Sequence, residues 1–191
     1  MIRTIKKFVE GVKRGQIEIY NEFSLQHELG ILIRSEFPDH KVEFGRNVSY
    51  FFRTGKFVKK EIDLAVFSPD KSILHYAIQL RFPRSMQYLR QMFGFCEDIL
   101  FLEQLKKSGF KQASLIIFTN DPLFYSGDAD GLCASFREKK RLQGSVPRPT
   151  GTKIDTIELS GSYEVQWITV FSGLKYTVIE AKESHGVHSP R

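Results

Sequence analysis

Cysteine is scarce: the chain of 191 residues contains only Cys96 and Cys133, which lie far apart in the sequence. They form no CxxC pair and no Cys/His cluster, which argues against a structural zinc site. Two isolated cysteines are typical of free thiols in a reducing compartment, so we expect a cytoplasmic protein. Cys96 also falls in the apolar stripe of an expected helix, and we therefore do not interpret it as a nucleophile.

Several segments that would mark other classes of protein are missing too. No apolar run is long enough to span a bilayer, and the first fifteen residues lack the apolar core of a signal peptide, so we expect no membrane partner. The phosphate-binding patterns GxGxxG and GxxxxGKS are absent, and no HExxH motif occurs. These absences remove the usual nucleotide-binding and metalloprotease signatures.

The chain is rich in phenylalanine and in positive charge. It has 17 phenylalanines, a hydrophobic content of 41% and a formal net charge of +6. This length and hydrophobicity predict a single domain over residues 1–191 with a true core. The charge favours a polyanionic partner, because lysines and arginines that meet phosphates release condensed counterions. Many basic proteins bind no nucleic acid, and that alternative stays open.

Apolar residues at helical spacing predict four helices. Residues 1–15 should form a short basic helix, and a second helix should run from about residue 21 to residue 36, where Pro38 stops it. A long amphipathic helix is expected over residues 86–108, with Gly109 as its C-cap. A shorter helix with a basic end follows at residues 132–144. Its run REKKR is most simply a solvated helix face.

Alternating and continuous apolar runs predict strands. Residues 57–67 and 74–82 alternate between apolar and polar positions, and residues 113–121 form a near-continuous apolar run that is typical of a strand covered on both faces. The expected remainder is an extended linker at 145–151, late strands at 156–159, 163–171 and 174–181, and a flexible tail at 183–191. This order predicts a mixed α/β sheet flanked by helices.

Three polar side chains should meet on one face of this sheet. If the strands at 57–67 and 74–82 pair through their apolar faces, Asp63, Gln79 and Arg81 share the opposite face. Carboxylate and carbonyl oxygens held together suit a hard cation such as Mg²⁺, and a nearby positive charge suits a phosphate under attack. An alternative is that Asp63 forms a structural salt bridge with Lys59, Lys60 or Arg81.

At this point the chain resembles the PD-(D/E)xK nuclease superfamily, whose fold is restriction-endonuclease-like. The matching pieces are Glu28 in NEFSLQHELG, Asp63 in KKEIDLAVF and Gln79-Leu80-Arg81 in AIQLRFP. The resemblance covers roughly residues 20 to 120. It implies a nuclease that cleaves DNA phosphodiester bonds with Mg²⁺ or Mn²⁺, with Glu28, Asp63 and Gln79 as metal ligands and Arg81 in the place of the lysine.

The resemblance also bears on partners. It implies DNA as the partner and a homodimer as the assembly, since many members of this fold act as dimers. Candidate phosphate contacts are Lys59 and Lys60 near the start of the first strand of the pair, and Arg84 and Arg90 after the second. The lysine pair is alternatively a solvated strand start, and Glu28 is alternatively a solvated residue at the edge of its helix stripe.

Two positions depart from the usual pattern. Gln79 stands where Glu is usual, and its carbonyl oxygen carries no charge. Arg81 stands where Lys is usual, and a guanidinium is always protonated and cannot accept a proton. These substitutions support a second hypothesis, in which a catalytically inactive nuclease fold binds nucleic acid or a protein partner.

Overall fold

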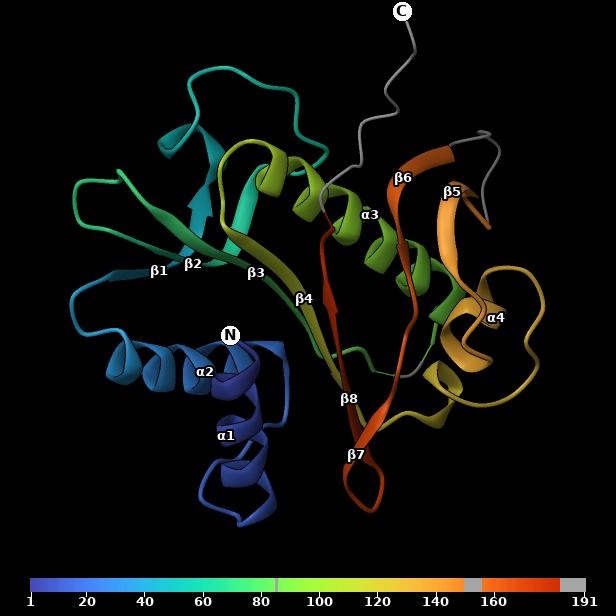
Figure 1. Cartoon of the computed structure of the whole chain (residues 1–191). Coiled ribbons are helices and arrows are strands. Elements are labelled where there is room, and N and C mark those ends of the chain that lie inside the picture. Colours follow the sequence, from blue (N-terminus) through green and yellow to red (C-terminus); the bar gives the residue numbers. More distant parts are fainter. Residues whose placement is uncertain (85, 150–155, 183–191) are drawn as a thin grey trace, which may run out of the picture.

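The computed structural model describes residues 1–84, 86–149 and 156–182. Within these residues a mixed six-stranded sheet has the strand order β1-β2-β3-β4-β8-β7, and it is flanked by helices as the sequence predicts (Figure 1). The helices are α1 (Ile2–Lys13), α2 (Glu22–Glu36), α3 (Tyr88–Lys107) and α4 (Leu132–Arg137). The first three confirm the helices expected near these positions.

The strands of the large sheet are antiparallel except at its centre. They are β1 (Lys41–Asn47), β2 (Glu61–Phe67), β3 (Leu74–Arg81), β4 (Gln112–Thr119), β7 (Ile168–Phe171) and β8 (Leu174–Glu180). Only β3 and β4 pair in parallel, because α3 carries the chain back along the sheet between them. A separate antiparallel pair is formed by β5 (Leu142–Pro147) and β6 (Thr156–Tyr163).

Two strands were not anticipated. The mixed sequence of β1 gives a weak alternating signal, yet it pairs along its length with β2. The helix expected over residues 132–144 ends at Arg137, and the linker expected from residue 145 is wrong for residues 145–147, which belong to β5. Buried Val146 and the partner β6 stabilise this strand. The REKKR run is therefore not a helix face, and the tail predicted at 183–191 lies outside the described residues.

The sheet separates two apolar clusters. One lies on the face of α3 and includes seven buried phenylalanines, namely Phe67, Phe93, Phe95, Phe101, Phe110, Phe124 and Phe136. The other lies under α1 and α2 and includes Phe8, Leu25, Leu29 and Phe118. Figure 1 shows α3 on one side of the sheet and α1 and α2 on the other. No helix of the described segments is long and apolar enough to cross a membrane.

The start of α2 is fixed by local hydrogen bonds. The Asn21 side chain accepts a hydrogen bond from the backbone N–H of Ser24 at 2.7 Å, and the Ser24 hydroxyl accepts one from the backbone N–H of Asn21 at 3.1 Å. This reciprocal cap satisfies backbone donors that a helix leaves unpaired at its N-terminus. It also sets Glu22 in the first turn, at the point where β3 ends.

Candidate functional site

Side chains replace backbone pairing where β2 and β3 separate. The β2–β3 ladder runs from the Phe67–Leu74 pair to the Leu64–Ile78 pair. Beyond it, a carboxylate oxygen of Asp63 accepts a hydrogen bond from the backbone N–H of Leu80 at 2.8 Å, and the Gln79 amide donates to the Glu61 carbonyl at 3.0 Å. The two side chains therefore bridge strands that no longer pair directly.

The structure brings Asp63, Gln79 and Arg81 together at the end of β3. Gln79 and Arg81 follow Ala77 by two and four residues and so lie on its face of β3, and a carboxylate oxygen of Asp63 lies 3.4 Å from Arg81. This face is the one that α3 covers. Gln79 is 1% exposed there, so its amide is enclosed rather than open to solvent.

Arg81 is surrounded by three carboxylates. Its guanidinium makes a bidentate pair with Asp98 of α3, with both N–O distances at 2.8 Å. Its third nitrogen lies 3.1 Å from a Glu22 oxygen and 3.4 Å from an Asp63 oxygen, and it also donates to the Leu80 carbonyl at 2.8 Å. A planar guanidinium suits this bidentate geometry, which an ammonium group does not reproduce.

Asp98 is the centre of the charged contacts. It is fully buried, and it also forms an ion pair with Lys59. We call the group of Glu22, Lys59, Asp63, Arg81 and Asp98 the Arg81 cluster. It joins α2, the segment before β2, β2, β3 and α3, and it contains three acids and two bases. A fully buried carboxylate persists only where cations and donors compensate its loss of water.

The pKa values of the cluster reflect its enclosure. Burial raises the pKa of Asp63 to about 6, although the positive charge of Arg81 and the Leu80 N–H act in the other direction. Burial alone would lower the pKa of Arg81, but the charges of Asp98, Asp63 and Glu22 outweigh it and raise that pKa above its usual value. Arg81 is therefore a fixed cation, and Asp63 is a carboxylate with a pKa raised above its usual value.

The other predicted metal ligand, Glu28, lies elsewhere on α2. Its carboxylate contacts the His27 ring at 3.2 Å. Gln26, by contrast, donates to the Asp63 carbonyl at 2.5 Å, and Glu22 reaches Arg81. Residues four apart share a helix face, whereas Glu28 follows Gln26 by two and points away from that face. The contacts of α2 with the cluster thus come from Glu22 and Gln26.

The four predicted phosphate contacts separate into two kinds. Lys59 is held by Asp98 within the cluster. Lys60, Arg84 and Arg90 are exposed; Arg84 donates to the Tyr20 carbonyl, and Arg90 lies 3.3 Å from the Gln87 side-chain oxygen. Neither arginine is neutralised by a carboxylate in these contacts, so both retain a positive charge at the surface beside the end of β3.

Two residues of the cluster were missed by the sequence analysis. Glu22 needed the tertiary fold, because nothing local places the start of α2 against the end of β3. Asp98 had a local signal: it lies in a helix segment whose residues Phe95, Cys96, Ile99, Phe101 and Leu102 are all buried. A single acid within a segment that is apolar on nearly all sides indicates a buried, paired charge.

The residues that could hold a metal do not fit one as they stand. Mg²⁺ and Mn²⁺ require several oxygen ligands that converge on open space. Here the carboxylates of Glu22, Asp63 and Asp98 converge on a guanidinium, and the Gln79 amide nitrogen donates to a backbone carbonyl. Across residues 1–84, 86–149 and 156–182, no group of three or more His, Cys, Asp or Glu side chains is arranged to hold a metal ion.

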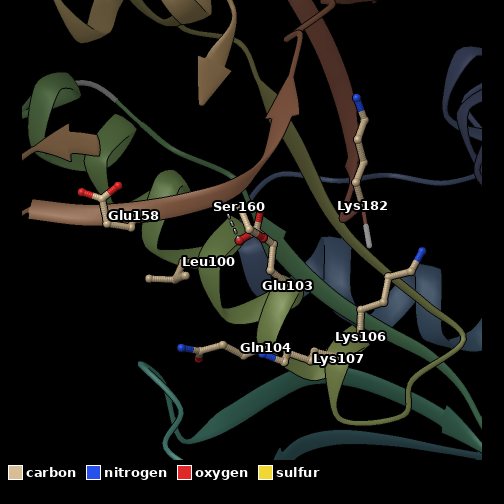
Figure 2. A pocket seen from close by; sticks show the side chains of 8 residues that line it. All are labelled: Leu100, Glu103, Gln104, Lys106, Lys107, Glu158, Ser160 and Lys182. Carbon is tan, nitrogen blue, oxygen red and sulfur yellow. Dashed lines mark hydrogen bonds between the residues drawn. The ribbon is translucent and has the colours of Figure 1, made fainter. Parts of the chain in front are cut away.

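A cleft lies between α3 and β6. It has a volume of about 420 Å³ and is lined by Leu100, Glu103, Gln104, Lys106, Lys107, Glu158, Ser160 and Lys182 (Figure 2). At its base, Glu103 accepts hydrogen bonds from the backbone N–H groups of Ser160 and Gly161 at 3.0 and 2.7 Å, and from the Tyr163 hydroxyl at 2.6 Å. These neutral donors pin α3 to β6, so we interpret Glu103 as a structural acid.

Comparison with known proteins gave no match, whether to a family model, to a curated protein or to a solved structure. A function for this chain is therefore inferred from the geometry of the Arg81 cluster and from the charges around it.

Proposed function

We propose that this protein is a nuclease-like protein that binds nucleic acid without cleaving it. The observation that carries the proposal is the position of Arg81, whose guanidinium lies among the three carboxylates of Glu22, Asp63 and Asp98. In a nuclease of the kind that the sequence resembles, acids at such a strand end hold a metal ion. In this chain the acids are compensated by a cation of the protein itself.

The surface next to the cluster supports binding of a polyanion. Lys60, Arg84 and Arg90 are exposed, and the chain as a whole carries a net charge of +6. Arg84 lies three residues after the end of β3, and Arg90 lies in the first turn of α3. Phosphate contacts of this type supply affinity without base specificity, so we expect binding that depends on salt more than on sequence.

The proposal is tested by fluorescence anisotropy with labelled duplex DNA, single-stranded DNA and duplex RNA at several salt concentrations. The double variant Arg84→Ala/Arg90→Ala should bind more weakly, and the slope of log K against log salt should fall by about 2 if each arginine contacts one phosphate. The matched control is Lys41→Ala/Lys71→Ala, which removes the same charge at the other end of the β2–β3 hairpin. Absence of binding at low salt, or equal effects of the two double variants, would contradict the proposal.

Metal-dependent cleavage of DNA is the second candidate function. It is favoured by Asp63, whose pKa of about 6 and location at a strand end are typical of carboxylates with a chemical role. Supercoiled DNA incubated with Mg²⁺ or Mn²⁺ distinguishes the candidates. Nicking by the natural chain that Asp63→Ala abolishes would replace the first proposal by the second.

A variant with the usual residues at positions 79 and 81 tests whether this chain is a nuclease that has lost its activity. The double variant Gln79→Glu/Arg81→Lys brings back the usual Glu-x-Lys pattern. Metal-dependent cleavage gained by this variant, and absent from the natural chain, supports the interpretation that Arg81 closes an ancestral site. The same preparations, measured by sedimentation velocity, test the homodimer that the resemblance implies.

A further inference from the structure

Two histidines face each other at the opposite end of β3 from the Arg81 cluster. His40 lies in the turn between α2 and β1, and His75 is the second residue of β3. Their Nε2 atoms are 2.8 Å apart, their ring centroids are 4.4 Å apart, and their planes are inclined by 78°. The pair is independent of the nucleic-acid surface proposed above, since no residue is shared between the two.

The rings are held in this arrangement by their neighbours. The His40 ring meets the edge of Phe37 at 5.9 Å, Phe37 in turn packs on Tyr76 at 5.5 Å, and the Tyr76 ring lies 6.1 Å from His75. The His40 backbone N–H also donates to the Phe37 carbonyl at 3.1 Å. A site whose side chains are already positioned loses little entropy when it binds a ligand.

The separation of the two nitrogens equals that of two ligands on one metal ion, and a small rotation of the rings away from their mutual hydrogen bond would turn both lone pairs toward one ion. Nitrogens bound at about 2.0 Å and at right angles to each other lie about 2.8 Å apart, as in the tetragonal geometry that Cu²⁺ and Ni²⁺ prefer. A tetrahedral ion such as Zn²⁺ spreads the same nitrogens to about 3.3 Å. We propose that His40 and His75 form a binding site for a divalent late transition metal ion, with Cu²⁺ bound most tightly and Ni²⁺ and Zn²⁺ less so.

The protonation state of the pair is compatible with this role. In the metal-free pair one Nε2 donates a hydrogen bond to the other. For both Nε2 atoms to bind a metal, the donor ring shifts its hydrogen from Nε2 to Nδ1. This change of tautomer releases no net proton. Burial, followed by the neighbouring His40 and Lys111, lowers the pKa of His75 below its usual value. Lys111 is the nearby cation that opposes a bound metal, and water supplies the remaining ligands.

The experiment uses the full chain, with the imidazole nitrogens followed by long-range ¹H–¹⁵N NMR during titration with ZnCl₂, CuCl₂ and MgCl₂. We expect Zn²⁺ to shift and Cu²⁺ to broaden the signals of His40 and His75 selectively, and Mg²⁺ to leave them unchanged. Equilibrium titration should give one Cu²⁺ per chain. His75→Ala should weaken this binding by about tenfold or more, since a two-ligand site becomes a one-ligand site.

Two matched controls use the other histidines of the chain. His27→Ala removes an exposed imidazole from α2, and His185→Gln/His188→Gln removes the two that follow the described residues; both should leave the Cu²⁺ affinity unchanged. His75→Gln keeps a polar side chain at the position if the alanine variant does not fold. The proposal is overturned if the His40 and His75 signals of the natural chain do not respond to Cu²⁺ or Zn²⁺, or if binding survives in the His75 variants but not in a control.

Discussion

Two buried acids of α3 sit in opposite surroundings. Asp98 lies in the part of the helix that faces the end of β3, and its partners are the cations of Arg81 and Lys59. Glu103 lies five residues later, and its partners are two backbone N–H groups and the Tyr163 hydroxyl. One acid is held by charge, and the other is held by neutral donors.

The difference separates two ways in which α3 buries an acid. Neutral donors are sufficient to bury a carboxylate that only joins two elements, as Glu103 joins α3 to β6. A cluster of three acids and two bases costs more to desolvate, and well-packed apolar residues would give equal or greater stability. We therefore expect the Glu103 contacts to govern stability alone, and the Arg81 cluster to govern stability together with the properties of the surface beside it.

The largest effect is expected for Asp98→Ala. Removal of the carboxylate leaves Arg81 and Lys59 without their main partner in an enclosed place, which should lower the free energy of unfolding by about 3–5 kcal/mol. Urea denaturation followed by circular dichroism measures this loss. Glu97→Ala, an acid one position earlier whose side chain is about one-third exposed, is the control and should change stability by less than about 1 kcal/mol. Similar losses for both variants would show that Asp98 is not a buried charge.

The stability contributed by Asp63 of the Arg81 cluster depends on pH. The pKa of Asp63 is about 6 in the fold and 3.8 for a free side chain, so the folded chain binds the additional proton between these values. Folding stability therefore falls as pH rises from about 4 to about 6, and the ionised form carries a penalty of at most about 3 kcal/mol above that range. Asp63→Asn should remove this slope and stabilise the protein at pH 7.

The measurement for Asp63 is the free energy of unfolding in urea at intervals from pH 4 to pH 7.5. The profile of the natural chain is compared with that of Asp63→Asn, because pH effects that are common to both chains then cancel. Parallel profiles would mean that Asp63 is solvated and that Arg81 compensates its charge in full.

The sequence predicted the surroundings of Arg81 at the end of β3 better than the β5–β6 pair to which Glu103 is joined. Alternation alone placed Asp63, Gln79 and Arg81 on one face, because a strand has only two faces and apolar residues mark the buried one. It could not place Glu22, since that contact depends on how α2 meets the end of β3. It did not identify β5, because the run LQGSVP contains a glycine and a proline that locally favour a turn, and the pairing with β6 overrides that preference.

Glu103→Gln should lower the free energy of unfolding by about 1–3 kcal/mol, since the amide nitrogen cannot accept the hydrogen bonds that a carboxylate oxygen accepts. The loss should be smaller than that of Asp98→Ala, because no buried charge is left without a partner. Urea denaturation of both variants under the same conditions makes the comparison. A loss equal to that of Asp98→Ala would mean that neutral donors and cations compensate a buried acid equally in this helix.

The smallest effect is expected for Tyr163→Phe, which keeps the ring and removes only the hydroxyl that donates to Glu103. The backbone donors of Ser160 and Gly161 remain, so the loss should be about 1 kcal/mol.

Burial, and then the hydrogen bond to Glu103, raises the pKa of Tyr163 above its usual value of 10. The stability that this shift contributes is fully present below pH 10 and is lost at higher pH. The natural chain should therefore lose stability above pH 10 more steeply than Tyr163→Phe does. Phenolate absorbance is measured for both chains, and the difference between their spectra reports Tyr163 alone. This separates it from Tyr176, whose pKa is also raised by burial. If Tyr163 ionises near pH 10, Glu103 is open to solvent and the contrast between the two acids of α3 fails.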